Sequence, residues 1–194
     1  QVLGPAIVEA LAQGQWIGGA AIERFELEVC AYTGARHTIA VASGTDALVL
    51  SLRALDIGPG DEVITPPNSF VASTAAIMMV GARPVFADVL PDQGLDPDAV
   101  ARVITPRTRA IMPVHLTGRI ARVAVIGALA ERFGLAVIED AAQAFGSRWR
   151  GVHAGRFGTV GCFSAHPLKN LNAVGDAGFV VTDDDGLAVR LRRL

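Results

Sequence analysis

The sequence predicts an α/β fold with three layers, in which helices cover both faces of a mostly parallel sheet. Two observations carry this prediction: short apolar segments alternate with helical segments along the chain, and the apolar segments lack a polar face. Strands of that composition are typical of a sheet that is covered on both sides. The length of 194 residues fits one domain, with at most a fragment of a second.

The predicted elements follow in order along the chain. Residues 20–32 suit a half-buried helix, because Ile22, Phe25 and Val29 recur at helical spacing. Further helices are expected over residues 46–55, 70–80, 97–104 and 123–133, and a last one from residue 187 to residue 194. Strands are expected over residues 37–42, 62–65, 84–88, 109–114, 135–139, 159–164 and 178–182, with turns rich in Gly, Pro and Asp between them.

Composition and charge exclude several classes of protein. A hydrophobic content of 51% is too high for a disordered chain, and a net charge of -2 gives no reason to expect nucleic acid as a partner. No apolar run reaches the roughly 18 residues of a membrane span. Cys30 and Cys162 cannot build a disulfide framework, and no Cys/His cluster predicts a metal site. We expect a cytoplasmic protein with no membrane or nucleic-acid partner.

The two ends of the sequence indicate a trimmed chain. It begins with Gln1 rather than Met, and no basic-then-apolar signal segment follows. The residues from Leu187 to Leu194 have the pattern of a helix that is still running at the last residue. We therefore expect that residues are missing at both ends.

Candidate binding residues are sought after each strand, because ligands of an open α/β sheet bind beyond the carboxyl ends of the strands. Ser43-Gly44-Thr45-Asp46 follows the first strand and opens a helix. Such a turn exposes backbone N–H groups at the positive end of the helix dipole, which favours a phosphate. The alternative is an ordinary helix N-cap. Neither a Walker A pattern nor a GxGxxG fingerprint occurs, which argues against nucleotide hydrolysis and dinucleotide binding.

Two later strand ends carry an aromatic ring and a carboxylate. Phe70 stands at a helix entrance, where it can stack on a flat ligand ring or belong to the core. Glu139 and Asp140 end another strand, and the pleat turns neighbouring side chains to opposite faces. Asp140 could hold a cationic ring nitrogen, or it could cap a helix. Glu139 is predicted to be structural.

Lys169 is the only lysine among 17 basic residues. Arginine keeps its proton, whereas a lysine amine can lose it and form a Schiff base with a carbonyl. A single lysine could occur by chance, but Lys169 lies in a loop after a strand. Ser164 lies upstream in the same region, and its hydroxyl could bind a second phosphate oxygen. In the same loop, His166 could simply be a packing residue. A phosphate cradle, a ring stacker, a ring-nitrogen acid and an amine, placed after successive strands, together describe a site for pyridoxal 5'-phosphate.

The sequence resembles the sugar aminotransferases of the DegT/DnrJ/EryC1/StrS family, which are fold-type I pyridoxal-phosphate enzymes. The resemblance runs nearly from end to end and is carried by several segments in order. These segments are residues 14–18 (GQWIG), 42–48 (ASGTDAL), 58–63 (GPGDEV), 84–88 (PVFAD), 113–118 (PVHLTG), 139–144 (EDAAQA), and 163–164 with 169–171 (FS, KNL).

The resemblance implies a role for each matching residue. Lys169 matches the lysine that binds the cofactor covalently, Asp140 the acid at the pyridine nitrogen, and Gln143 the residue near the ring hydroxyl. Phe70 matches the aromatic residue stacked on the ring. The phosphate contacts are matched by Gly44, Thr45 and Ser164. Two departures matter: the family's small C-terminal domain is absent from residues 1–194, and so is the asparagine that a partner subunit brings to the phosphate.

The resemblance further implies a homodimeric aminotransferase that moves an amino group from glutamate or glutamine to a nucleotide-linked keto-sugar. An ionised Asp140 would keep the pyridine nitrogen protonated, and a released Lys169 would move a proton as general acid and base. Amination of a keto-inositol and a truncated regulatory protein without turnover are alternatives. The related sugar 3-dehydratases carry His in place of the lysine, so the presence of Lys169 argues against a dehydratase. Residues 1–194 alone are expected to bind the cofactor poorly.

Overall fold

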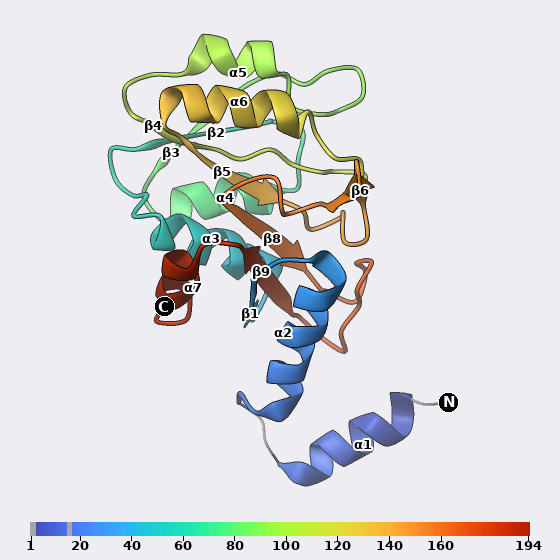
Figure 1. Ribbon diagram of the computed structural model, residues 1–194. Coiled ribbons are helices and arrows are strands. Elements are labelled where there is room, and N and C mark those ends of the chain that lie inside the picture. Colours follow the sequence, from blue (N-terminus) through green and yellow to red (C-terminus); the bar gives the residue numbers. More distant parts are fainter. Residues whose placement is uncertain (1–2, 15–16) are drawn as a thin grey trace.

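A seven-stranded sheet forms the centre of the computed structural model, which describes residues 3–14 and 17–194 (Figure 1). The strands are β1 (His37–Val41), β2 (Glu62–Thr65), β3 (Arg83–Phe86), β4 (Thr108–Ile111), β5 (Ala136–Asp140), β8 (Val160–Ser164) and β9 (Gly178–Thr182). Their order across the sheet is β1-β9-β8-β5-β4-β2-β3. Only β9 runs against the others, since it pairs antiparallel with both β1 and β8. The prediction of a mostly parallel sheet is confirmed.

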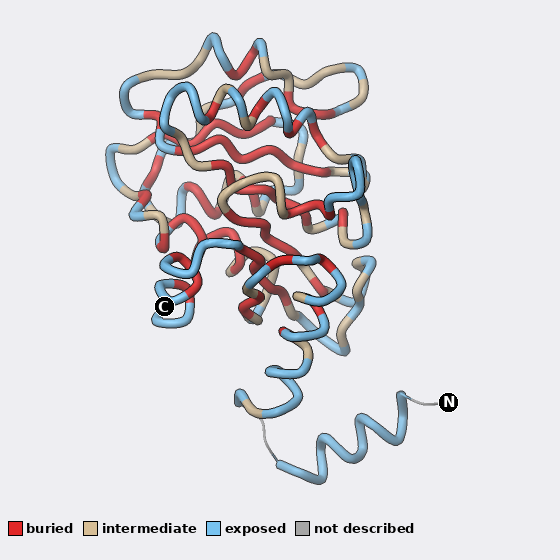
Figure 2. Tube along the Cα trace, in the orientation of Figure 1, coloured by how far each residue is buried: buried red, intermediate tan, exposed pale blue. Residues whose placement is uncertain are grey.

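Helices cover both faces of this sheet, as the sequence predicted. On one face pack α3 (Gly44–Ala54), α4 (Val71–Met79) and α7 (Asp185–Leu191). On the other face lie α2 (Ala20–Thr33), α5 (Pro97–Val103) and α6 (Val123–Phe133). The three-layer arrangement leaves the centre of the sheet buried on both sides, as Figure 2 shows.

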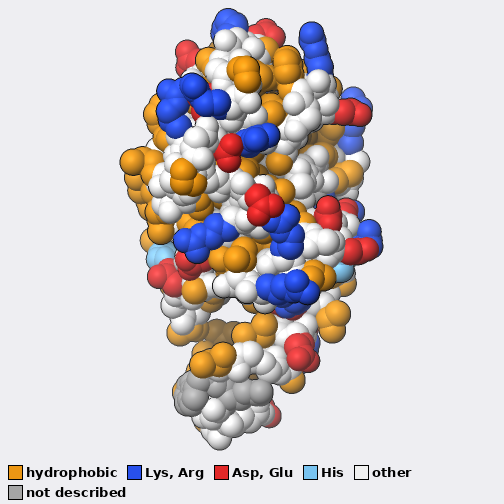
Figure 3. All heavy atoms as spheres, turned by 90° about the vertical axis from the view of Figure 1, so that its left-hand side faces the viewer, with side chains coloured by type: hydrophobic (Ala, Val, Ile, Leu, Met, Phe, Trp, Pro, Cys, Tyr) orange, Lys and Arg blue, Asp and Glu red, His pale blue; other side chains and the backbone are white. Residues whose placement is uncertain are grey.

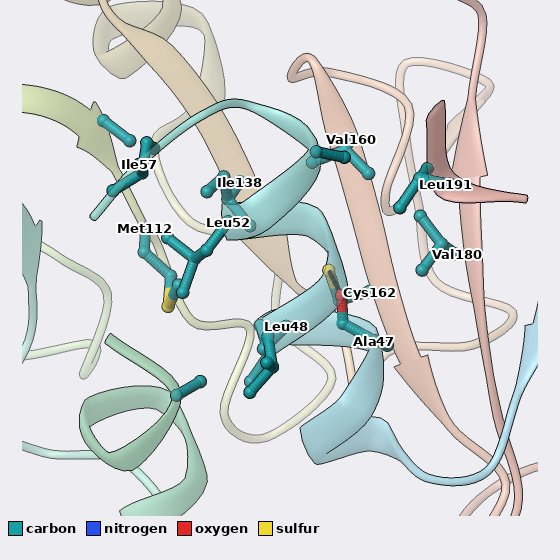
Figure 4. Close-up of a cluster of buried hydrophobic side chains, with 14 of the residues drawn as sticks. Ala47, Leu48, Leu52, Ile57, Met112, Ile138, Val160, Cys162, Val180 and Leu191 are labelled. Atoms are coloured by element: carbon teal, nitrogen blue, oxygen red, sulfur yellow. Dashed lines mark hydrogen bonds between the residues drawn. The ribbon is translucent and has the colours of Figure 1, made fainter. Parts of the chain in front are cut away.

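The strand pleat divides the core between the two layers of helices. In β8, Cys162 packs into the cluster under α3, whereas the neighbouring Phe163 packs with Phe179 against the layer that contains α2. The first cluster gathers Leu52, Ile138 and other apolar side chains from three helices and six strands, part of which Figure 4 shows. Continuous apolar strands are needed here because both faces of each strand are dry.

Helix ends follow local sequence signals. Ser43 and Asp96 accept backbone hydrogen bonds at the N-termini of α3 and α5, and α5 begins with Pro97, whose ring suits the first helical position. Gly34 and Gly134 end α2 and α6 in the left-handed conformation, with φ of 80° and 64°. These caps explain why the predicted boundaries of the central helices are close to the observed ones.

Some elements differ from the prediction. Helix α1 (Leu3–Gln13) and the short pair β6 (Arg148–Trp149) and β7 (Val152–His153) were not expected. Helix α1 buries none of its residues and lies apart from the sheet in Figure 1. Strand β4 ends at Ile111 instead of residue 114, and α7 ends at Leu191 instead of continuing to residue 194.

Two further observations concern the N-terminal stretch and the surface. In the family-like segment 14–18, Gln15 and Trp16 lie outside the described residues. Within the described ranges, no helix is long and apolar enough to cross a bilayer. On the face drawn in Figure 3, basic and acidic side chains are interspersed rather than gathered by sign.

A buried carboxylate ties together the amino ends of three strands. Glu62 is 1% exposed. Its carboxylate accepts hydrogen bonds from Thr105 Oγ1 at 2.6 Å, Arg83 Nη2 at 2.7 Å and Arg107 Nε at 2.8 Å. The hydrogen bond from Thr105, together with those from Arg83 and Arg107, lowers the pKa of Glu62 to about 2.

This network predicts a loss of stability in acid. The pKa of Glu62 is lower in the folded chain than in the unfolded chain, so its contribution is complete above about pH 4.5 and is lost as pH falls toward about 2. We expect Glu62→Gln to lower the free energy of unfolding at pH 7 by about 1–3 kcal/mol and to flatten its decline in acid. Urea unfolding between pH 2.5 and 7 measures both effects, with a substitution of the exposed Glu131, Glu131→Gln, as the control. An unchanged acid dependence in Glu62→Gln would contradict this account.

Candidate active site

The structure brings all the predicted site residues to one cavity of about 580 Å³. The cavity opens at the carboxyl edge of the sheet, where β1, β2, β5 and β8 end. Its lining includes the seven predicted residues: Gly44, Thr45, Phe70, Asp140, Gln143, Ser164 and Lys169. They come from four separate stretches of sequence, which only the sheet order makes neighbours.

The N-terminus of α3 forms one wall of the cavity. Ser43 caps the helix, because its Oγ accepts a hydrogen bond from Asp46 N at 3.0 Å. The N-cap is therefore present. It does not use the backbone N–H groups of Gly44 and Thr45, which have no acceptor within the helix and remain available to a ligand. The cap and the anion cradle are thus compatible, since they use different N–H groups.

Two glycines allow this turn to sit against β8 and β9. A Cβ on Gly44 would lie 2.6 Å from Ser164 Cβ, and a Cβ on Gly178 would lie 2.4 Å from the Ser43 carbonyl carbon and oxygen. Both distances are far shorter than a van der Waals contact. The absence of side chains here therefore lets the N–H groups of α3 and the hydroxyl of Ser164 share one wall.

Asp140 is the last residue of β5 and is 6% exposed. Its Oδ2 accepts a hydrogen bond from Ser73 Oγ at 2.6 Å, and its Oδ1 accepts one from Ala142 N at 3.2 Å. The alternative of a helix N-cap is wrong, because the chain enters turns after residue 140 and no helix begins there.

Among the described residues, no Lys, Arg or His side chain forms an ion pair with Asp140. Buried carboxylates are normally matched by a cation or saturated with hydrogen bonds. A carboxylate has about four lone-pair sites, of which two are used here. Asp140 therefore has both the charge and the free acceptor capacity to bind a cationic ligand atom in the cavity.

Glu139 lies on the opposite face and is fully committed to the protein. It accepts hydrogen bonds from the backbone N–H groups of Gly155, Phe157 and Gly158 at 2.6–2.8 Å, and it pairs with His115 Nε2 at 2.9 Å. His115 Nδ1 accepts from Ala121 N, so the ring proton sits on Nε2 and is donated to Glu139. These contacts give Glu139 the structural role that was predicted, because they connect β5 to the loop that contains His115 and to the loop that contains Gly155.

Phe70 and Lys169 lie on loops at the cavity. Phe70 immediately precedes α4 and is 68% exposed, so the alternative that it belongs to the core is wrong. Lys169 N donates to His166 O at 2.8 Å, and His166 Nδ1 accepts from Leu168 N at 3.2 Å. His166 thus helps to shape the turn that presents Lys169, in agreement with the packing alternative, and it also lines the cavity.

Sequence reasoning missed the partner of Asp140. Ser73 is completely buried in α4 and was not among the predicted site residues. The sequence did contain a signal, since two adjacent hydroxyl residues, Ser73 and Thr74, stand in an otherwise apolar helix one turn after Phe70. The partner of Ser73 is 67 positions away, and nothing in the local pattern indicates which strand the hydroxyl meets.

An α/β fold with a lysine, a buried aspartate and a helix N-terminus around one cavity defines a class of pyridoxal-phosphate-type enzymes. The model of the DegT/DnrJ/EryC1/StrS aminotransferase family matches residues 4–194, and the chain belongs to this family. The enzymes of this family depend on pyridoxal phosphate.

Individual proteins show the same likeness. The chain is 48% identical over 190 residues to the dTDP-3-amino-3,4,6-trideoxy-alpha-D-glucose transaminase of Streptomyces venezuelae, which covers 97% of the chain and 50% of that protein. It is 52% identical over 172 residues to a UDP-N-acetyl-3-dehydro-alpha-D-glucosamine 3-aminotransferase of Acidithiobacillus ferrooxidans, covering 87% and 46%. The X-ray structure of S. venezuelae DesV superposes with a TM-score of 0.95 at 48% identity, covering 98% of this chain and 52% of that one. The chain thus spans about half the length of these relatives.

The close approach at Gly44 leads to a stability prediction. In Gly44→Ala the new Cβ must push α3 away from Ser164, so we expect the free energy of unfolding to fall by about 1–3 kcal/mol. Gly127→Ala is the matched control, because Gly127 lies within α6 and a Cβ there meets nothing within 4 Å. That substitution should raise stability by up to about 1 kcal/mol through helix propensity. Equal effects of the two substitutions in urea unfolding would refute the close contact.

Proposed function

We propose that the protein is a pyridoxal-phosphate-dependent aminotransferase that transfers an amino group from glutamate or glutamine to a nucleotide-linked keto-sugar. The observation that carries the proposal is the placement of the only lysine, Lys169, in the same cavity as Asp140, a buried carboxylate that forms no ion pair within residues 3–14 and 17–194. The names of the relatives support the acceptor class, since both are transaminases of nucleotide-linked sugars.

The residues present fit the cofactor. The N–H groups of Gly44 and Thr45 and the hydroxyl of Ser164 form a cradle for the phosphate, and the glycine at position 44 keeps it narrow. Phe70, exposed at the cavity, would lie against the ring face, and Gln143 would approach the ring hydroxyl. When bound, the cofactor supplies a protonated ring that accepts electrons from the reacting carbon.

The chain's own residues would do the rest of the chemistry. Asp140 would hold a proton on the ring nitrogen, because its negative charge favours the protonated form. The Lys169 amine would bind the cofactor covalently. After an amino substrate displaces it, Nζ would take the proton from the substrate α-carbon and deliver it again as a general acid. Glu139 cannot replace Asp140 at the ring nitrogen, because the oxygens of Glu139 already accept hydrogen bonds from four donors.

We further propose that the active enzyme is a homodimer in which a second copy covers the cavity mouth. Phe70 and Leu168 line the cavity, form an apolar rim there and are 68% and 86% exposed. An apolar patch of this kind is typical of an interface. In this proposal, residues 1–194 are the N-terminal segment and large domain of a longer enzyme, and a smaller C-terminal domain completes the substrate site. Cys30 and Cys162 are free, which fits a cytoplasmic location.

The covalent role of Lys169 can be tested directly. Full-length protein loaded with pyridoxal phosphate is reduced with borohydride, digested and mapped by mass spectrometry. We expect the pyridoxyl group on Lys169, because it is the amine that lines the cavity. Lys169→Arg keeps the positive charge but provides no nucleophile, so it should remain unlabelled. Label on another residue, or none on the loaded wild type, would overturn the mechanism.

The role of Asp140 leads to a kinetic prediction. Asp140→Asn keeps the shape of the side chain but removes the charge, and we expect kcat to fall by about 100-fold or more while the fold is retained. The exposed Asp98→Asn is the control and should leave kcat unchanged. Steady-state kinetics with a panel of keto-sugar and keto-inositol acceptors would measure the effect and identify the acceptor. Wild-type turnover in Asp140→Asn would show that the carboxylate does not act on the ring.

A further inference from the structure

We propose that Ser73 is a positioning residue, which orients the Asp140 carboxylate toward the cofactor ring and fixes it relative to Phe70. The inference rests on the proposed function, since it concerns the ring nitrogen that Asp140 would hold. It is carried by one buried hydrogen bond and by the position of Ser73 in α4.

The hydroxyl of Ser73 has one proton and a clear preference for its acceptor. Asp140 Oδ2 lies 2.6 Å from Ser73 Oγ, whereas the other nearby acceptor, Phe70 O, lies 3.4 Å away. A distance of 2.6 Å is typical of a hydroxyl bound to an ionised carboxylate, and such bonds are roughly twice as strong as neutral ones. The proton is therefore directed at Asp140.

Two bonds on different oxygens fix the plane of the carboxylate. Ser73 holds Oδ2, and the backbone N–H of Ala142 holds Oδ1 at 3.2 Å. The contact with Ala142 is local and long, whereas the contact with Ser73 comes from another element and is short. Without the hydroxyl, rotation about the last side-chain bond of Asp140 would be restrained only by the Ala142 contact.

Ser73 also connects the two groups that would touch the ring. Its backbone N–H donates to Phe70 O at 3.2 Å, in the first turn of α4. Phe70 would meet the face of the ring, and Asp140 its edge. A single buried residue thus sets the distance between the aromatic side chain and the acid, although the two lie 70 positions apart in the sequence.

The test measures the ring nitrogen itself. Full-length wild type, Ser73→Ala, Ser73→Cys, Asp140→Asn and Thr74→Ala are loaded with pyridoxal phosphate labelled with ¹⁵N in the ring. The ¹⁵N chemical shift, followed against pH, reports the protonation of that nitrogen independently of turnover. Thr74→Ala is the control, because Thr74 is the next residue of α4 and makes no side-chain hydrogen bond to the described residues.

We expect the ring nitrogen of Ser73→Ala to lose its proton at a pH about one unit lower than in wild type, with Asp140→Asn shifted further. The cofactor dissociation constant should rise about threefold to tenfold, the range that one lost hydrogen bond predicts. Ser73→Cys keeps the size of the side chain, but a thiol is a weak donor. Its ring nitrogen should therefore lose the proton at a pH between the values of wild type and Ser73→Ala. Ser73→Cys also replaces Ser73→Ala if that variant does not fold.

The outcomes separate this inference from the proposed function. A wild type without bound cofactor or without a protonated ring nitrogen overturns both. If the wild-type nitrogen is protonated and responds to Asp140→Asn, but Ser73→Ala and Ser73→Cys titrate like Thr74→Ala, the positioning role alone is wrong. A lower melting temperature with an unchanged ¹⁵N titration would likewise make Ser73 a purely structural residue.

Discussion

The pleat of strand β5 separates two adjacent carboxylates, and the arrangement of the site depends on that separation. Glu139 turns toward His115 and the loop that contains Gly155, where four donors bind its two oxygens. Asp140 turns toward the cavity, where its carboxylate accepts a hydrogen bond from the Ser73 hydroxyl. Because consecutive side chains of a strand point to opposite faces, one carboxylate can anchor the scaffold while its neighbour remains available to a ligand.

The parallel sheet converts separate strand ends into one site. Strands β1, β2, β5 and β8 run in the same direction, so the segments that follow them meet at one edge. The N-terminus of α3, the exposed ring of Phe70, the buried Asp140 and Lys169 each come from a different connection. Every central strand of the scaffold below them is packed on both faces, as the buried stretches in Figure 2 show.

The glycines close one wall of the cavity, whereas the apolar rim at its mouth is exposed to water. Gly44 and Gly178 close one wall by permitting backbone contact that no side chain would allow. Phe70 and Leu168, by contrast, leave apolar surface in water at the mouth. A wet mouth weakens every polar contact in the site. This physical cost is why a covering partner and a further domain belong to the proposed function, and the length of the relatives agrees with it.

The alternation of apolar strands and capped helices was enough to predict the three layers, because that pattern is local and both faces of each strand must be dry. The sequence by itself also determined which residue types could form the site: one lysine, a strand-end aspartate, and a glycine before a helix. It missed α1, which buries nothing, and the two-residue strands β6 and β7, which are too short to show a period.

Only the tertiary structure decided between the alternatives that the local pattern left open. It showed that Phe70 is exposed, that Asp140 caps no helix, and that Ser73 is the partner of Asp140. The reason is physical: a periodic pattern records which face of an element is buried, whereas a hydrogen bond between α4 and β5 depends on the order in which the strands assemble. Contacts of that kind join residues far apart in the chain, and the sheet order alone brings them within reach.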